Sequence, residues 1–204
     1  MVESLNTVNR GYSSIPAGHI ASIVTCLEML ENPITNHVQL PEGFSLCLYH
    51  SHDLDEYRNL FRFIGADWLW FSRLLMSDEK LDEILKEPTR EIYVIRYADK
   101  DVGLLELDFG VAGEAELVFL GLTSEVRGKG IGRAVMDTAT SLAWQKPIQR
   151  FWVHTCTFDH PSALGFYIRS GFKPYALKLE VQADPRISGH LPLSAATHVP
   201  IIMD

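Results

Sequence analysis

Cysteine, basic residues and long apolar runs are all scarce in this chain. The 204 residues include only 3 cysteines, Cys26, Cys47 and Cys156, and these are too widely spaced for a disulfide framework or a Cys-x-x-Cys metal knuckle. Free thiols fit a reducing compartment, so we expect a cytoplasmic protein. The cysteine pattern also predicts no metal site.

Basic residues are outnumbered by acidic ones, 18 to 26, which gives a formal net charge of −8. A negative field disfavours a broad nucleic-acid-binding surface and weakly favours a cationic or amine substrate. No run of about 18 apolar residues occurs, and the first residues lack the apolar core of a signal peptide. We therefore expect neither a nucleic acid nor a membrane among the partners.

The most informative stretch is TSEVRGKGIGR at 123–133, which lies between an apolar run at 117–122 and a helical pattern at 134–144. Glycine lets the backbone approach a ligand closely, and the first N–H groups of a helix are unpaired and carry partial positive charge. An apolar strand, a glycine-rich turn and a helix start therefore predict a phosphate-binding turn.

Two familiar glycine signatures do not fit this turn. A nucleotide P-loop needs Gly-Lys-Ser/Thr, but Lys129 is followed by Gly130. A dinucleotide fingerprint needs GxGxxG, whereas Gly128, Gly130 and Gly132 are spaced by two residues throughout. The pattern R/Q-x-x-G-x-G/A does fit, over residues 127–132.

On this motif the chain resembles the GNAT superfamily of acyl-CoA-dependent N-acyltransferases. Residues 115–122, AELVFLGL, look like the fourth strand of that family, with a glutamate at its start. Residues 160–172 look like its N-x-x-A-x-x-[LF]-Y…GF segment, with His160 in place of the usual Asn. The resemblance covers roughly residues 42–182, and the HTCT-DHP string at 154–161 is similar to a bacterial branch for which it implies no substrate.

Hydrophobic periodicity gives an order of elements that agrees with this resemblance. The β-branched residues of 20–29 favour a strand, and Asp53 and Ser77 are good N-caps for two helices. A helix over 130–145 connects a strand at 115–122 to one at 150–157, and such a crossover makes the two strands parallel. The remaining predicted elements are strands at 44–49, 91–97, 103–109, 173–182 and 198–203, the last a short one, and a helix from Pro161 to Ser170.

The predicted fold class is α/β (α+β), a GNAT fold with a mixed sheet of about seven strands and helices on both faces. An antiparallel meander precedes a parallel pair, near 115–122 and 150–157, and the resemblance implies that this pair splays apart. We expect an N-terminal arm over 1–40 with an extra strand, a GNAT domain over 41–182, and a C-terminal extension over 183–204 that packs on it.

The resemblance also implies how acetyl-CoA would bind. The pantetheine arm would lie between the splayed strands, and the pyrophosphate would lie on the glycine-rich turn. His160 could bond to the pantetheine or simply cap its helix. The other implied binding residues are Leu120, Gly121, Leu122, Arg127, Gly128, Lys129, Gly130, Ile131, Gly132 and Arg133.

Acyl transfer to an amine needs a base for the amine proton and an acid for the departing thiolate. Glu116 is the best base, because apolar neighbours on its strand face raise a carboxylate pKa; a solvated strand-end carboxylate is the alternative, with Glu114 and Glu106 as substitutes. Tyr167 occupies the position that the resemblance gives to the general acid, although a tyrosine packed on the sheet would give the same pattern.

Two further groups of residues have competing interpretations. His154 and Cys156 share one strand face, which could give a Cys–His nucleophile or half a metal site, but the sequence favours buried structural residues. Trp68, Trp70 and Phe71 could line an acceptor pocket, although core packing is the favoured interpretation.

The leading functional hypothesis is an N-acetyltransferase that moves an acetyl group from acetyl-CoA to a primary amine in a ternary complex. The acceptor is a small molecule or a peptide, acetyl-CoA is a cosubstrate, and no metal takes part. The alternative is a non-catalytic acyl-CoA-binding sensor or interaction module, and a covalent Cys156 acyl-enzyme is a third hypothesis. Neither a monomer nor a homodimer is excluded.

Overall fold

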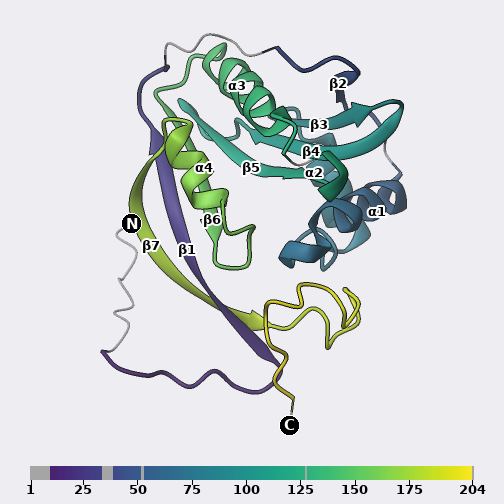
Figure 1. Cartoon of the computed structure of the whole chain (residues 1–204), viewed down its shortest axis with the longest axis vertical. Helices are drawn as coiled ribbons and strands as arrows, with labels where there is room; N and C mark the ends of the chain where they lie inside the picture. The colour runs from purple at the N-terminus through teal and green to yellow at the C-terminus, as the bar shows by residue number, and fades with distance from the viewer. Residues whose placement is uncertain (1–9, 34–38, 52, 127, 204) are drawn as a thin grey trace.

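The computed structural model describes residues 10–33, 39–51, 53–126 and 128–203, which form one seven-stranded sheet with helices against it (Figure 1). The strand order is β2-β3-β4-β5-β6-β1-β7. The strands are β1 His19–Met29, β2 Phe44–Leu48, β3 Arg90–Tyr97, β4 Lys100–Asp108, β5 Glu114–Leu122, β6 Arg150–Cys156 and β7 Lys173–Ala183. The helices are α1 Leu54–Gly65, α2 Asp78–Lys86, α3 Ile131–Trp144 and α4 Ala163–Arg169, with 3-10 turns η1 Ala66–Trp68 and η2 Ser124–Val126.

The sheet is mixed, as the sequence predicted. Strands β2 to β5 form an antiparallel meander, and β5 and β6 are parallel because α3 connects them. The predicted strand at 20–29 is confirmed as β1, which pairs antiparallel with both β6 and β7. A segment near the N-terminus therefore lies inside the C-terminal half of the sheet, and β7 forms the edge.

Alternating side chains give the sheet two apolar faces, and each face has its own helices. Val135 and Ala139 of α3 pack in one cluster with Leu105 of β4. Tyr57 and Phe61 of α1 pack in the other, together with Leu104, the neighbouring residue on β4. Successive residues of a strand point to opposite faces. The prediction of helices on both faces is therefore confirmed.

Both predicted N-caps are confirmed. The Asp53 carboxylate accepts hydrogen bonds from the backbone N–H groups of Asp55 and Glu56 at 3.0 Å, and Ser77 accepts from the N–H of Lys80 at 3.3 Å. Each cap satisfies donors that the first turn of a helix leaves unpaired. The two caps fix where α1 and α2 begin, and so place the segment between them.

The short strand predicted at 198–203 was wrong, because residues 184–203 form turns organised around a buried arginine. The Arg186 guanidinium pairs with Asp184 at 2.7 Å and donates to the carbonyls of Ala195, Ala196 and Val199. These carbonyls are satisfied by a side chain and not by a neighbouring strand. Within the described residues, no helix has both the length and the apolar character needed to cross a membrane.

Candidate functional site

A cleft opens where β5 and β6 separate. The two strands are paired from Glu114 opposite Arg150 to Leu117 opposite Val153, and no pairs follow. Beyond that point β5 continues to Leu122, and a cavity of about 670 Å³ lies between the diverging strands. The splayed pair predicted from the sequence is therefore present. Leu120, Gly121 and Leu122 line this cavity, as expected for a strand segment that could bond to a ligand.

The glycine-rich turn brings a set of backbone N–H groups to one end of the cleft. Gly128 and Gly130 both have φ of +78°, a conformation that favours glycine, and a Cβ at either position would meet nothing within 4 Å. Gly130 precedes α3 and gives it no side-chain cap. Across the described chain, no acceptor takes the N–H groups of residues 128–132. Four of the cleft-lining residues, Gly128, Gly130, Ile131 and Gly132, thus belong to an open helix N-terminus.

Of the cationic side chains of this turn, Arg133 lines the cleft and Lys129 does not. Arg133 lines the cleft, and its Nε donates to both carboxylate oxygens of Asp137 at 2.9 and 3.1 Å. The Lys129 Nζ lies 5.2 Å from the centre of the Tyr97 ring, away from the residues that line the cavity. Arg127 lies outside the described residues. The turn therefore offers a guanidinium and a set of N–H donors, a combination that fits a diphosphate.

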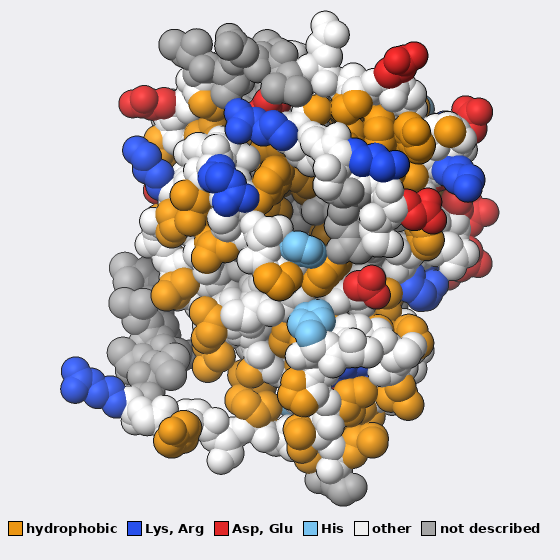
Figure 2. Space-filling model, in the orientation of Figure 1, with side chains coloured by type: hydrophobic (Ala, Val, Ile, Leu, Met, Phe, Trp, Pro, Cys, Tyr) orange, Lys and Arg blue, Asp and Glu red, His pale blue; other side chains and the backbone are white. Residues whose placement is uncertain are grey.

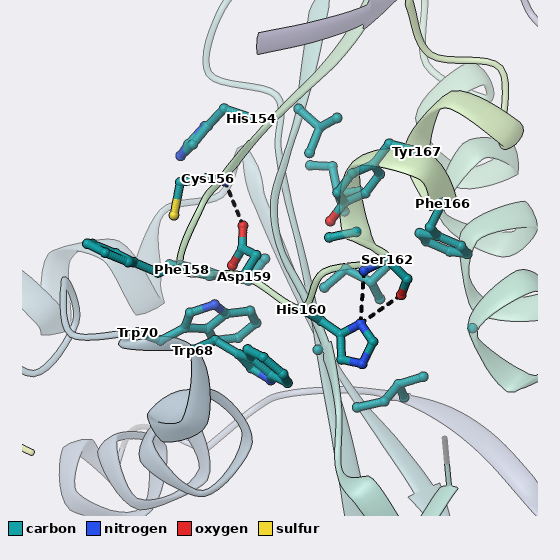
Figure 3. Close-up of a pocket in the computed structure, with 18 of the residues that line it drawn as sticks. Trp68, Trp70, His154, Cys156, Phe158, Asp159, His160, Ser162, Phe166 and Tyr167 are labelled. Carbon is teal, nitrogen blue, oxygen red and sulfur yellow. Dashed lines mark hydrogen bonds between the residues drawn. The ribbon is translucent and has the colours of Figure 1, made fainter. Parts of the chain in front are cut away.

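Tyr167 reaches into the cleft from α4. Its ring is 8% exposed and packs against Phe166 and Phe172. Figure 3 shows its hydroxyl turned towards the loop that carries Asp159. Burial raises the pKa of Tyr167, and the nearby Asp159 carboxylate raises it further. The phenol therefore keeps its proton through the neutral range, as a group that donates a proton must.

Glu116 is separated from the cavity by a histidine. Its Oε1 lies 3.5 Å from Nδ1 of His154, and His154 lines the cleft whereas Glu116 does not. The side chains are 48% exposed for His154 and 21% for Glu116. The interaction with Glu116 raises the pKa of His154, although partial burial opposes this. The prediction of a buried, structural His154 was wrong, because this residue directly follows Val153, the last β6 residue paired with β5.

Cys156 points into the same cleft but is not activated. Burial raises the pKa of its thiol to about 11, and the nearby Asp159 carboxylate adds to the effect. Only a thiolate is a strong nucleophile, and this thiol stays protonated at neutral pH. Among the described residues, no group of three or more His, Cys, Asp or Glu side chains could hold a metal ion.

The two substitute carboxylates are engaged elsewhere. Glu106 is fully buried and accepts hydrogen bonds from Arg73 at 2.5 Å, from Tyr57 at 3.1 Å, and from Arg90. Glu114 pairs with Arg150 at 3.1 Å. Neither carboxylate lines the cleft, so neither can reach a substrate there.

The aromatic residues after α1 both pack in the core and line the cleft. Trp70 contacts the Phe119 ring at 4.9 Å and also borders the cavity, as do Trp68 and Phe71. A Cβ at Gly121 would come within 2.7 Å of the Trp70 ring, so this glycine is what lets the indole lie across β5. These side chains therefore pack in the core and line the cleft at the same time, and a role in binding an acceptor stays a prediction.

His160 bonds to the turn before α4 and also borders the cleft, and its role in pantetheine binding stays a prediction. Its Nδ1 accepts a hydrogen bond from the backbone N–H of Ser162 at 3.1 Å and lies 2.7 Å from the Ser162 hydroxyl, which caps the turn before α4 (Figure 3). Its ring also lines the cleft, 5.0 Å from the ring of Trp68. Because Nδ1 accepts from Ser162, the ring proton belongs on Nε2.

Three acidic residues, Glu116, Asp159 and Glu180, lie around the cleft, and the sequence predicted a role only for Glu116. Asp159 accepts hydrogen bonds from the Thr155 hydroxyl at 2.7 Å and the Cys156 N–H at 2.9 Å. Glu180 of β7 lines the cavity, and it was missed because nothing local connects β7 to the site. Asp159 lies in the HTCT-DHP string, so that string was the available signal. With Glu116 behind His154, these carboxylates make this side of the cleft acidic.

Comparison with known proteins gives the family. The model of the acetyltransferase (GNAT) family matches residues 55–172, more than half of the chain. The protein therefore belongs to this family of acyltransferases. A search of curated proteins gave no match.

Solved structures share the fold at low sequence identity. A GCN5-related N-acetyltransferase from Sphaerobacter thermophilus has a TM-score of 0.57 at 15% identity, over 81% of this chain and 53% of that one. One from Kribbella flavida has a TM-score of 0.54 at 19% identity, over 82% and 60%. The aminoglycoside acetyltransferase meta-AAC0020 from an uncultured soil metagenomic sample, in complex with sisomicin, has a TM-score of 0.51 at 18% identity, over 63% and 87%. The chain thus spans little more than half the length of the first two.

Proposed function

We propose that this protein is an acetyl-CoA-dependent N-acetyltransferase that transfers an acetyl group directly to a primary amine in a ternary complex. The single observation that carries the proposal is the open N-terminus of α3 beside the gap between β5 and β6. Its donors match a diphosphate, and the gap can accept an extended pantetheine arm that leads towards Tyr167.

Within this proposal the glycine-rich turn and the end of β5 hold the cosubstrate. Backbone N–H groups of residues 128–132 would bind the diphosphate, with Arg127, Lys129 and Arg133 as cations of the same turn. The free edge of β5 at Leu120 to Leu122 would bond to the pantetheine. His160 lines the same cavity and is the further side chain that we assign to cosubstrate binding.

The chemistry would be shared between the two sides of the cleft. Acetyl-CoA supplies a thioester whose C–S bond breaks as a C–N bond forms to the amine. Tyr167 gives the thiolate a proton, and the amine loses its proton to the Glu116–His154 pair. We propose that Glu116 keeps His154 oriented and that Nε2 of His154, the nitrogen on the other side of the ring, takes the proton.

The acceptor is proposed to be a cationic amine. Asp159 and Glu180 line the cleft and Glu116 lies behind His154, so the acceptor side carries negative charge. Trp68, Trp70 and Phe158 give it aromatic walls that suit a cation. Because one structural neighbour is named an aminoglycoside acetyltransferase, amino sugars belong in the first panel of acceptors, together with polyamines and peptide amines.

The test is turnover and binding measured side by side. Purified protein is incubated with acetyl-CoA and the amine panel, released thiol is followed, and coenzyme A binding is measured by calorimetry. Turnover that fails when the acceptor is omitted supports the proposal. Tight binding with no turnover on any amine supports a non-catalytic sensor instead, and full activity after alkylation of Cys156 excludes a covalent thiol intermediate.

A further inference from the structure

Strand β7 is one of the two edge strands of the sheet, opposite β2, and carries a row of exposed apolar side chains. It pairs with β1 on one side, and within the described residues no strand pairs with its other side. Leu177, Leu179 and Val181 are 72%, 42% and 44% exposed. Ile23, opposite Leu179 on β1, is 45% exposed. Several hydrophobic side chains lie at the surface, among polar ones, on the side of the molecule where Figure 1 draws β7 (Figure 2).

An edge of this kind is normally protected. Unpaired N–H and C=O groups along an extended strand are a template for another strand, and soluble proteins usually protect such edges with charges, prolines or bulges. Here the bulge of β7 lies near Pro174, and residues 177–181 pair regularly with β1. The regular part of the edge is also its most apolar part, which points to a surface that another strand covers.

The other face of β7 carries opposite charges on either side of Leu179. Lys178 and Glu180 are both exposed, and within the part of the chain that the structure describes neither forms a salt bridge. Glu180 accepts a long hydrogen bond from the Ser22 hydroxyl at 3.5 Å and interacts electrostatically with His154. A strand with an apolar residue between a lysine and a glutamate is complementary to its own copy when the two run antiparallel. Opposite charges that face one another across two strands stabilise the pairing, whereas like charges destabilise it.

The charges select one register. In an antiparallel pair, residues directly opposite each other have their side chains on the same side of the sheet. A two-fold axis normal to the sheet therefore passes beside a residue that lies opposite its own copy in the partner strand. An axis at Lys178 or at Glu180 would oppose like charges. An axis at Leu179 places Lys178 opposite the partner's Glu180, and Leu177 opposite the partner's Val181, twice each.

We propose that β7 pairs antiparallel with β7 of a second copy about a two-fold axis at Leu179, which makes the protein a homodimer with one continuous sheet. The dimer places the partner's Lys178 next to Glu180, a residue that lines the cleft. The partner therefore adds a cation at the margin of the acceptor side. This inference rests on the edge of the sheet and is independent of the proposed function.

Cysteine cross-linking tests the register directly. Under mild oxidation the Leu179→Cys variant should form a covalent dimer, because the two introduced thiols face each other across the axis. Leu177→Cys alone should not, but a mixture of Leu177→Cys with Val181→Cys should. The wild-type chain is the control for Cys26, Cys47 and Cys156. Failure of Leu179→Cys to cross-link above the wild-type level would overturn the proposal.

Charge reversal gives a second, non-covalent test by light scattering after gel filtration. Lys178→Glu should raise the dimer dissociation constant by about tenfold, because two attractive pairs become repulsive. Adding Glu180→Lys to the same chain should restore the dimer. A wild-type protein that remains a monomer at every concentration, or a double variant that is no tighter than Lys178→Glu, would contradict it.

Discussion

Replacing Tyr167 by phenylalanine removes one hydroxyl from the cleft and little else. The ring keeps its packing against Phe166 and Phe172, and the hydroxyl has no hydrogen-bond partner within the described residues. The free energy of unfolding should therefore change by about 1 kcal/mol or less. Coenzyme A affinity should stay the same, because the role proposed for the phenol is to protonate the departing sulfur and not to bind the diphosphate.

Turnover should respond very differently. Loss of a positioned general acid lowers kcat by about 10²–10⁴, which corresponds to a barrier increase of about 2.7–5.4 kcal/mol at 1.36 kcal/mol per tenfold. Because burial holds the pKa of Tyr167 above its usual value, the tyrosine is protonated through the neutral range, and its removal should lower kcat without changing the shape of the pH profile.

The assay is steady-state thiol release with saturating acceptor, with melting temperature and coenzyme A affinity measured on the same samples. Tyr175→Phe is the matched control, since Tyr175 is 46% exposed and does not line the cleft. It should leave kcat unchanged. If Tyr167→Phe loses less than threefold in kcat, the phenol is not the acid.

Three further predictions follow from other parts of the structure. The pKa of His154 is raised chiefly by Glu116, and the carboxylates of Asp159 and Glu180 add to the effect. We therefore expect kcat/KM to rise with pH as the His154 imidazolium loses its proton. Glu116→Gln should move this rising limb of the pH profile to lower pH, and His154→Gln should abolish it. A limb that survives His154→Gln would show that another group is the base. Gly132→Ala should raise the melting temperature, because alanine favours a helix by about 0.5–1 kcal/mol over glycine and its Cβ would come no closer than 3.8 Å to another side chain. The same variant should weaken coenzyme A binding, since its methyl group would lie at the proposed diphosphate site. Unchanged affinity would place the diphosphate elsewhere. Burial opposes ionisation of Asp184, but the hydrogen bonds from Arg186 outweigh the effect of burial and lower the pKa of the carboxyl. The stabilisation that the ionised Asp184 contributes is therefore present above pH ~4 and is lost as the pH falls through the lowered pKa. Asp184→Asn should cost about 3–5 kcal/mol in urea unfolding at neutral pH and flatten the acid dependence, and a loss below 1 kcal/mol would contradict this.

Local signals predicted most of the elements. Caps such as Asp53 and Ser77 fix helix starts through bonds to residues two or three positions away, so they are visible in the sequence. The glycine-rich turn is equally local, since Gly128 and Gly130 adopt positive φ within the turn itself. The parallel pair followed from the helix between its strands.

What the sequence did not predict depends on contacts between distant residues. The place of β1 between β6 and β7 is set by pairing over more than a hundred positions. His154 lines the cleft because β5 and β6 separate just before it. The alternation of apolar and polar residues within β6 does not indicate where a neighbouring strand separates from it. Arg186 orders the last turns through three carbonyls, a pattern without a sequence signature.

Calorimetric titration of the purified protein with coenzyme A tests the central claim most directly. An open helix N-terminus that binds a diphosphate predicts a saturable, one-to-one heat, and Gly130→Val should reduce the affinity at least tenfold, since a side chain at φ +78° strains the turn and covers its donors. If neither coenzyme A nor acetyl-CoA gives a binding heat with the wild-type protein, the account is contradicted.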